Sequence, residues 1–239
     1  MNTTKLKKNK AKIIAHRGLS GIECENSIAA FVAAGNRSYF GIETDIHVTA
    51  DKKFVVHHDD SALRMTGADV IMEETTLENL QKLPLYNKEE GKFRSDLCMP
   101  TLEEYIGICK KYEKKAILEL KRHMEFDVVK SVVEIVKGLD YLEETVFISF
   151  DWDNLVYIKQ IVPSQHVQFL CKEWDDELIK KLKENDFQLD ISRKVVTKKL
   201  VKKIHKAGLK INCWTCDDKK ETEKLLSYGV DYITTNILE

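Results

Sequence analysis

Short runs of β-branched and other apolar residues recur along the chain, and amphipathic segments of helical length separate most of them. The runs that we interpret as strands occupy residues 12–16, 40–48, 115–121, 145–150, 166–171, 187–192, 209–214 and 230–235. Between them, apolar residues recur every three or four positions, as at Leu102, Tyr105 and Ile106, which is the spacing of a helix that packs one face inward. Strands that alternate with helices in this way pair in parallel.

Eight strand–helix units in one chain of 239 residues favour a closed barrel, so we predict an α/β fold of the (β/α)₈ TIM-barrel type. Gly138, Gly208 and Gly229 follow helical runs, where a left-handed cap residue is expected. No glycine-rich dinucleotide-binding fingerprint follows the first strand. We expect a single barrel domain over residues 11–239, preceded by a basic tail at residues 1–10.

One segment, residues 51–100, interrupts the alternation between the second and third strands. It begins with FVVHHDD and continues as a polar stretch to about Met99. Because it contains too few apolar residues for an independent core, we expect a hairpin extension, a loop and a short helix within the barrel domain.

The charge balance argues against a polyanionic partner. Thirty-eight Lys and Arg nearly cancel thirty-nine Asp and Glu, so no overall field attracts nucleic acid or an anionic membrane. The basic first residues lack the apolar core of a secretory signal, and no run approaches the roughly 18 apolar residues of a membrane span. We therefore expect a cytoplasmic protein with no nucleic-acid partner and no membrane span. The sequence does not indicate an oligomeric state.

Six cysteines lie mostly within apolar strands or helix faces rather than in a regular loop framework. Cys213 and Cys216 form a CWTC segment that could suggest redox chemistry or half of a zinc site. The other half of such a site is missing, so we expect both thiols to be buried and structural.

Carboxylates occur near the carboxyl ends of the second and third predicted strands. Glu43 and Asp45 are two residues apart, so they project from the same face of their strand, and Glu119 and Lys121 repeat this spacing. Carboxylates that converge in a barrel mouth repel one another unless a cation lies between them, and hard oxygen ligands favour Mg²⁺ or Ca²⁺. The alternative is that they form ion pairs with neighbouring basic groups.

Basic side chains occupy matching positions. His16 and Arg17 end the first strand, which places an acid–base group and a bidentate anion ligand at the face where barrel active sites lie. His57 and His58 are strand neighbours that face opposite ways, so only one of them can join His16. Lys121 supplies a charge for a phosphate oxygen or, alternatively, acts as an aldolase-type Schiff-base nucleophile. Nearby carboxylates favour the first role because they keep the ammonium protonated.

Together these segments resemble the glycerophosphodiester phosphodiesterase family. AHRGLSGIECENSIAAF resembles the first signature of the family, and GIETDIHVTADKKFVVHHDDSALRMTG resembles the second, with the family's histidine–aspartate at His58 and Asp59. The segments MPTLEEYI, ILELK, ISFD, GLKINCWT and GVDYITTN follow in family order. The resemblance runs from about residue 12 to the last residue.

The resemblance implies metal-dependent hydrolysis of small-molecule glycerophosphodiesters to glycerol 3-phosphate and an alcohol. It implies a divalent cation, Mg²⁺ or Ca²⁺, bound by Glu43, Asp45 and Glu119. It further implies an acid–base pair formed by His16 and His58.

By the same resemblance, Arg17 and Lys121 hold the phosphate. Trp214 lines the glycerol side of the pocket, unless it only packs at the top of the barrel. Glu25 and Asn26 match a turn that buttresses His16, although Asn26 is also a candidate helix cap.

Two residues depart from the family pattern, and a third histidine lies near the acidic pair. Asn236 stands where many relatives carry an aspartate, and Leu63 replaces an acidic residue, and we expect neither to touch the reacting groups. His47 shares a strand face with Glu43 and Asp45, but it lies beyond them, so we expect a solvent-facing rim residue.

Two other functions remain open. A related phosphodiesterase or lyase that acts on lysophospholipid or phosphoinositide head groups shares the barrel, the acidic site and the histidine pair, but it needs apolar access for acyl chains. A non-catalytic protein that binds a phosphate-bearing ligand is the alternative from a different class, because a fold does not by itself guarantee chemistry.

Overall fold

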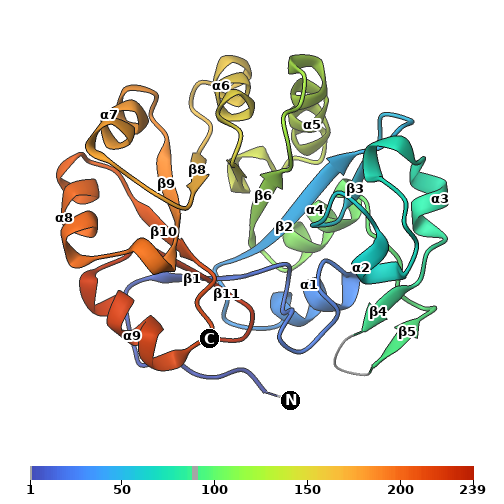
Figure 1. Cartoon of the computed structure of the whole chain (residues 1–239), viewed down its shortest axis with the longest axis horizontal. Coiled ribbons are helices and arrows are strands. Elements are labelled where there is room, and N and C mark those ends of the chain that lie inside the picture. The colour runs from blue at the N-terminus through green and yellow to red at the C-terminus, as the bar shows by residue number, and fades with distance from the viewer. Residues whose placement is uncertain (1, 88–90) are drawn as a thin grey trace.

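The computed structural model describes residues 2–87 and 91–239 and forms a closed barrel surrounded by helices (Figure 1). Within these residues the parallel strands are β1 (Lys12–Ala15), β2 (Gly41–Val48), β6 (Lys115–Leu120), β7 (Thr145–Ser149), β8 (Val167–Cys171), β9 (Gln188–Ser192), β10 (Ile211–Trp214) and β11 (Tyr232–Thr235). Strand β1 pairs with both β11 and β2, which closes the sheet. The predicted (β/α)₈ barrel is therefore confirmed, and each strand lies where the sequence pattern placed it.

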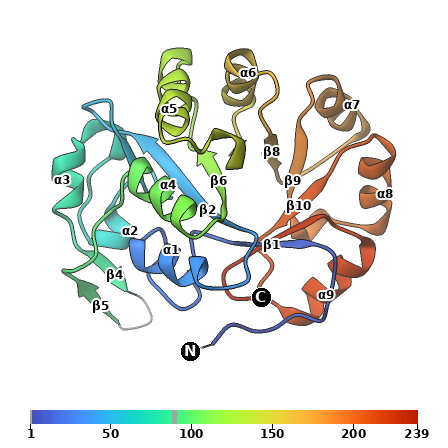
Figure 2. The ribbon, with the colours of Figure 1, turned by 180° about the vertical axis from the view of Figure 1, so that it is seen from behind.

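Helices cover the outside of the barrel (Figures 1 and 2). They are α1 (Ile28–Gly35), α4 (Leu102–Lys111), α5 (Phe126–Gly138), α6 (Trp152–Ile161), α7 (Asp176–Glu184), α8 (Lys198–Lys206) and α9 (Lys219–Tyr228). Many begin at a side chain that accepts a hydrogen bond from the first turn. These caps are Ser27, Thr101, Asp151, Asp175, Thr197 and Asp218. Because Ser27 caps α1, the helix-cap role considered for Asn26 is wrong.

Two of the three glycines predicted to follow helices adopt a left-handed backbone conformation. Gly208 and Gly229 have φ values of +82° and +91°, as expected after a helix. Gly138 instead remains within α5, and Asp140 takes the positive φ in the following turn. Among the residues described, every helix is too short or too polar to cross a bilayer.

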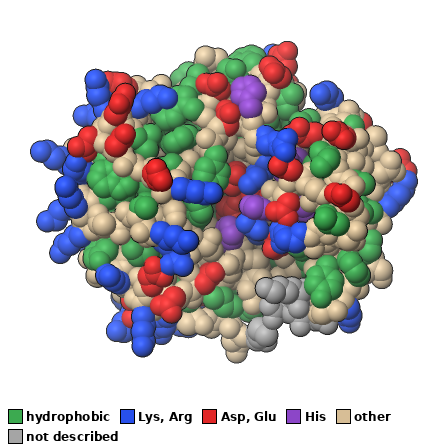
Figure 3. Space-filling view, viewed as in Figure 1, with side chains coloured by type: hydrophobic (Ala, Val, Ile, Leu, Met, Phe, Trp, Pro, Cys, Tyr) green, Lys and Arg blue, Asp and Glu red, His purple; other side chains and the backbone are tan. Residues whose placement is uncertain are grey.

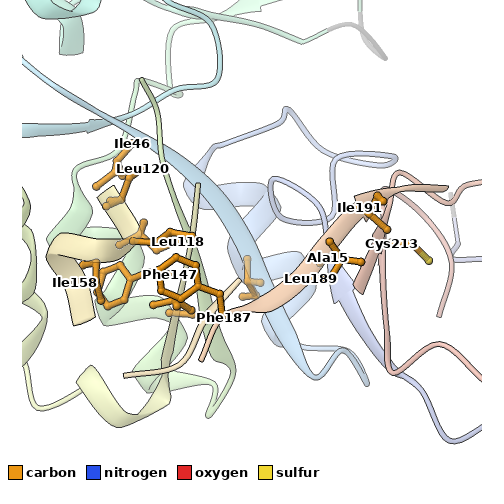
Figure 4. Packing of buried hydrophobic residues seen from close by; sticks show 14 of the residues in the cluster. Ala15, Ile46, Leu118, Leu120, Phe147, Ile158, Phe187, Leu189, Ile191 and Cys213 are labelled. Atoms are coloured by element: carbon orange, nitrogen blue, oxygen red, sulfur yellow. The ribbon is translucent and has the colours of Figure 1, made fainter. Parts of the chain in front are cut away.

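The alternation of side chains along each strand separates two apolar layers. Outward-facing residues such as Leu118, Phe147 and Phe187 pack against helices, including Ile158 of α6 (Figure 4). A smaller cluster faces the barrel interior and comprises Ile14, Ile117, Val146, Ile148, Leu170 and Tyr232. This inner cluster lies below the polar residues at the strand ends.

Residues 51–100 form more regular structure than the sequence suggested. Strand β3 (Phe54–Val56) pairs antiparallel with β2. It is followed by α2 (Leu63–Thr66), a 3₁₀ turn η1 (Met72–Glu74), α3 (Leu77–Gln81), β4 (Leu85–Asn87) and β5 (Lys92–Arg94). The segment has its own small apolar cluster, which includes Met72, Leu80 and Met99 and joins the barrel side through Cys24. This extension holds the loop after β3 over the barrel mouth.

The turn after β1 generates a stability prediction. Gly18 has φ +73°, and an added Cβ would lie 2.7 Å from Ala30 atoms, whereas a Cβ at Gly107 of α4 meets no atom within 4 Å. We expect Gly18→Ala to lower the free energy of unfolding by about 1–3 kcal/mol because of backbone strain. Gly107→Ala should raise it by about 0.5–1 kcal/mol. Denaturant unfolding of both variants checks this, and equal stabilities would contradict it.

Candidate active site

The carboxyl ends of the barrel strands surround a cavity of about 100 Å³. Histidine, basic and acidic side chains gather around this hollow at the centre of the face in Figure 3. The lining residues are His16, Arg17, Glu43, Asp45, His58, Glu119, Ile148, Phe150, Leu170, Asp190, Trp214, Thr215 and Thr234. The structure thus brings together the site residues expected from sequence, with Lys121 directly behind Glu119.

Three acidic side chains converge at one side of this cavity. Asp45 and Glu119 are paired in the register of β2 and β6, and Glu43 lies on the same face of β2. The three residues are buried, and each offers a carboxylate oxygen within 4.8 Å of the others. Such a set of hard oxygen donors fits a cation of the Mg²⁺ or Ca²⁺ type.

The three carboxyl groups differ in electrostatic environment. Burial, together with repulsion from Asp45 and Glu119, raises the pKa of Glu43 well above its usual value. Burial and Asp45 raise the pKa of Glu119 to about 8. Burial acts in the same direction on Asp45, but the charges of Lys121 and Arg17 outweigh it and hold the Asp45 pKa low. Protein cations alone therefore stabilise only one of the three carboxylates.

Two cationic side chains lie against the trio. Lys121 Nζ is 2.8 Å from Glu119 Oε1 and 3.5 Å from Asp45 Oδ1. Burial tends to lower the pKa of Lys121, but Asp45 and Glu119 raise it overall, so the ammonium remains charged. Arg17 Nε is 3.7 Å from Asp45, and the Arg17 backbone N–H donates to Glu43 Oε2 at 2.8 Å. The ion pairs considered from sequence are present beside the candidate cation site.

Residues of the turn before α1 brace the acidic and basic groups. Glu25 accepts a hydrogen bond from Arg17 Nη1 at 2.8 Å. Asn26 donates to Asp45 Oδ2 at 2.8 Å and accepts from the Thr44 hydroxyl at 2.7 Å. The expectation that these two residues buttress His16 is therefore wrong in detail, because their side chains hold Arg17 and Asp45.

His16 has a neutral partner. Its Nδ1 lies 2.7 Å from Asn236 Oδ1, and the Ser20 hydroxyl donates to the same oxygen at 2.7 Å. Asn236 in turn donates through Nδ2 to Asp217 at 2.6 Å. Burial, aided by Arg17, lowers the pKa of His16 to about 4. The expectation that Asn236 lies away from the reacting groups is wrong, because chain closure brings its side chain onto His16.

His58 has a charged partner. Its Nδ1 lies 2.6 Å from Asp59 Oδ1, and Arg64 binds the other oxygen of Asp59. Burial acts to raise the pKa of Asp59, but its bonds to Arg64 and His58 lower it to about 2, so Asp59 is a carboxylate. His57 is buried and does not line the cavity.

Two other sequence expectations differ in outcome. His47 is only 1% exposed, so a solvent-facing position is wrong. The residues that follow β3 pack against the His47 ring, and His47 Nε2 lies 3.5 Å from the His58 carbonyl oxygen. Cys213 and Cys216 are buried free thiols with Sγ atoms 3.8 Å apart, in agreement with a structural role.

The side of the cavity formed by β7 to β11 was largely missed from sequence. Trp214 lies there and packs edge-on against Phe150, with ring centroids 5.7 Å apart. Asp190 also lines the cavity, although nothing in the sequence separates it from an ordinary strand residue. Spacing identified carboxylates that occur in pairs, whereas Asp190 occurs alone.

A wider groove of about 980 Å³ extends outward from His16 and Arg17. Its lining is mixed: Glu23, Glu25 and Arg64 are charged, whereas Met65 and Ile237 are apolar. The charged side chains can bind a polar group.

Comparison with known proteins identifies similar sequences. The sequence model of the Glycerophosphoryl diester phosphodiesterase family matches residues 16–239. YhdW of Bacillus subtilis (strain 168) is 30% identical over 231 residues, which cover 94% of this chain and 93% of that protein. The glycerophosphodiester phosphodiesterase of Caldanaerobacter subterraneus is 28% identical over 234 residues, which cover 95% and 94% of the two chains.

Solved structures share the architecture. A phosphodiesterase from Oleispira antarctica, in complex with the product sn-glycerol-3-phosphate, matches with a TM-score of 0.86 at 27% identity, covering 94% of this chain and 92% of that chain. A glycerophosphodiester phosphodiesterase from Parabacteroides distasonis matches with a TM-score of 0.81 at 33% identity, covering 96% and 94%.

The acidic cluster generates a prediction about ion binding. A divalent cation should raise the thermal unfolding temperature, by an amount corresponding to about 2.7 kcal/mol at one hundred times the dissociation constant. Glu119→Gln removes one negative charge from the ligand set and should abolish most of this increase. Asp153→Asn is the matched control, because Asp153 belongs to an exposed His123–Asp151–Asp153 group elsewhere on the surface. Loss of the cation effect in the control alone would contradict the assignment.

Proposed function

This chain belongs to the Glycerophosphoryl diester phosphodiesterase family, and from that premise we propose that it hydrolyses water-soluble glycerophosphodiesters to glycerol 3-phosphate and an alcohol with the help of a divalent cation. The observation that carries this proposal is the convergence of three buried carboxylates, Arg17 and two imidazoles on one cavity, with Lys121 Nζ 2.8 Å from Glu119. The product bound to the Oleispira antarctica enzyme supports the same substrate class.

Glu43, Asp45 and Glu119 would hold the cation. The raised pKa values of Glu43 and Glu119 support this, because they show that the protein's own cations leave the acidic cluster incompletely neutralised. When bound, Mg²⁺ or Ca²⁺ would polarise a phosphoryl oxygen and acidify a coordinated hydroxyl. Arg17 and Lys121 would hold the remaining phosphate charge, since both stay protonated beside these acids.

We assign His16 as the general base. Asp217 can only accept hydrogen bonds, so the amide nitrogen of Asn236 faces Asp217 and the amide oxygen faces His16. That oxygen also only accepts, so the proton of neutral His16 resides on Nδ1 and leaves Nε2 as a proton acceptor. The lowered pKa keeps the ring neutral. Nε2 would take a proton from the attacking group, which is either the glycerol 2-hydroxyl or a water.

We assign His58 as the general acid. Burial, with Arg17 and Lys121, lowers the pKa of His58, whereas Asp45 and the hydrogen bond to Asp59 act in the opposite direction. The Asp59 carboxylate at Nδ1 would favour the imidazolium, which is the form that can protonate a leaving alkoxide. The leaving alcohol would occupy the groove beside Arg17, where Glu25 and Arg64 can bind a polar head group.

The substrate class is tested by assaying glycerol 3-phosphate release from glycerophosphocholine and choline-containing product from lysophosphatidylcholine. We expect turnover of the first, loss of activity on chelation, and recovery with Mg²⁺ or Ca²⁺. Turnover of lysophosphatidylcholine alone would favour the lipid-directed alternative. Tight product binding without turnover of any diester would favour the non-catalytic alternative.

The acid assignment predicts a dependence on the leaving group. His58→Ala should lower kcat by about 10²–10⁴-fold for glycerophosphocholine. The loss should be much smaller for a glycerophosphodiester with a nitrophenyl leaving group, because nitrophenolate needs no proton to depart. His16→Ala should affect both substrates similarly. If the nitrophenyl substrate instead restored the activity of His16→Ala and not of His58→Ala, His16 would be the acid and His58 the base.

The base assignment predicts a pH shift. Asn236→Asp places a carboxylate at His16 Nδ1 and should raise the pKa of His16, so the acidic limb of the kcat/KM profile moves to higher pH. Asn36→Asp, at the exposed end of α1, is the matched control. An unchanged acidic limb in Asn236→Asp would argue against His16 as the titrating base.

A further inference from the structure

The cavity has two chemically different walls. The charged wall comes from β1, β2, β6 and the loop after β3. In the strand order of the closed barrel, β9 lies across from β2. The facing wall is mostly neutral and consists of Ile148, Phe150, Leu170, Asp190, Trp214, Thr215 and Thr234.

Asp190 is the one acidic lining residue of this second wall, and it is poorly satisfied. It is 1% exposed, and its Oδ1 has no hydrogen-bond partner among the residues that the structure describes. Among the described residues its hydrogen-bond partner is the side chain of Asn212 on β10, which itself bonds to Thr234. No ion pair to Asp190 occurs within residues 2–87 and 91–239. A buried carboxyl oxygen of this kind is costly unless a ligand or water completes it.

Trp214 presents a second incomplete group. Its Nε1 is buried without an acceptor in the described part of the chain. The wall therefore combines an aromatic surface with one hydrogen-bond donor and one carboxyl group. Aromatic faces accommodate C–H groups, and sparse polar groups fix orientation, which is the combination that suits a small polyol.

We propose that Asp190 binds the terminal hydroxyl of the substrate's glycerol moiety and so selects phosphodiesters that carry this hydroxyl. The inference rests on the proposed function, since it takes the phosphate to lie at the charged wall. An acidic side chain cannot hold the phosphate itself, so its position also sets the direction in which the diester enters. Burial raises the pKa of Asp190 to about 7, and a hydroxyl can bond to either protonation state because it both donates and accepts.

An ammonium head group fits this wall less well. An ionised carboxylate attracts a cation more strongly than a neutral acid does, and burial favours the neutral acid at Asp190. The face of Phe150 is also already approached by Lys172, with Nζ 5.9 Å from the ring centroid. A head-group site at Asp190 is accordingly an outcome that the experiment must distinguish.

The test compares glycerophosphocholine with 2-hydroxyethyl phosphocholine, which keeps the attacking hydroxyl and the leaving group but lacks the terminal hydroxymethyl. We expect Asp190→Ala to lower kcat/KM for glycerophosphocholine by about 10–100-fold. The shorter substrate should change by no more than about threefold. Asp190→Asn retains a hydrogen-bonding group and should recover much of the discrimination.

Gln168→Ala is the matched control. Gln168 on β8 is equally buried with an unpartnered oxygen, but it does not line the cavity. Gln168→Ala should leave the ratio of the kcat/KM values for the two substrates unchanged. Equal losses on both substrates in Asp190→Ala would overturn the proposal in favour of a structural role. If Asp190→Ala lowered kcat/KM for glycerophosphocholine but not for glycerophosphoethanol, whose head group is uncharged, head-group binding would replace the proposal.

Calorimetry separates this inference from the proposed function. Wild type should bind sn-glycerol 3-phosphate more tightly than 2-hydroxyethyl phosphate, and Asp190→Ala should remove the difference. This result would support the hydroxyl subsite even if no diester were hydrolysed. Equal affinities of wild type for the two phosphates would overturn it even if hydrolysis were observed.

Discussion

Electrostatic repulsion among three buried carboxyl groups is the constraint on which the rest of the site depends. Glu43, Asp45 and Glu119 lie on adjacent strands with oxygens within 4.8 Å. Burial alone would protonate them, and only Asp45 is held ionised by protein charges. Part of the repulsion is offset because Lys121, Arg17 and Asn26 each bond to one of the three acids.

Support for the charged wall extends outward through the segment between β2 and β6. Arg64 bonds to both Glu25 and Asp59, and these acids contact Arg17 and His58 respectively. One guanidinium thus links the groups proposed to bind phosphate and to donate a proton. The small apolar cluster of residues 51–100 fixes the loop that carries this link. Residues 51–100 therefore contribute to the catalytic site that we propose.

Features that depend on local periodicity could be predicted from the sequence. The strands follow from apolar runs, and the shared face of Glu43 and Asp45 follows from the two-residue repeat of a strand. Features that depend on distant pairing could not. Asn236 reaches His16 across 220 positions only because β1 and β11 are neighbours. His47 is buried because the chain that follows β3 packs against its ring, which side-chain spacing does not reveal.

The closure of the barrel has a consequence for how the site comes into being. The first and last strands meet, and a short pairing of Thr4 with Leu238 extends the contact beyond them. His16 therefore acquires its fixed tautomer only when the final strand has docked. A chain in which β11 has not docked would lack an oriented imidazole at His16, so chemical competence depends on the last step of barrel closure.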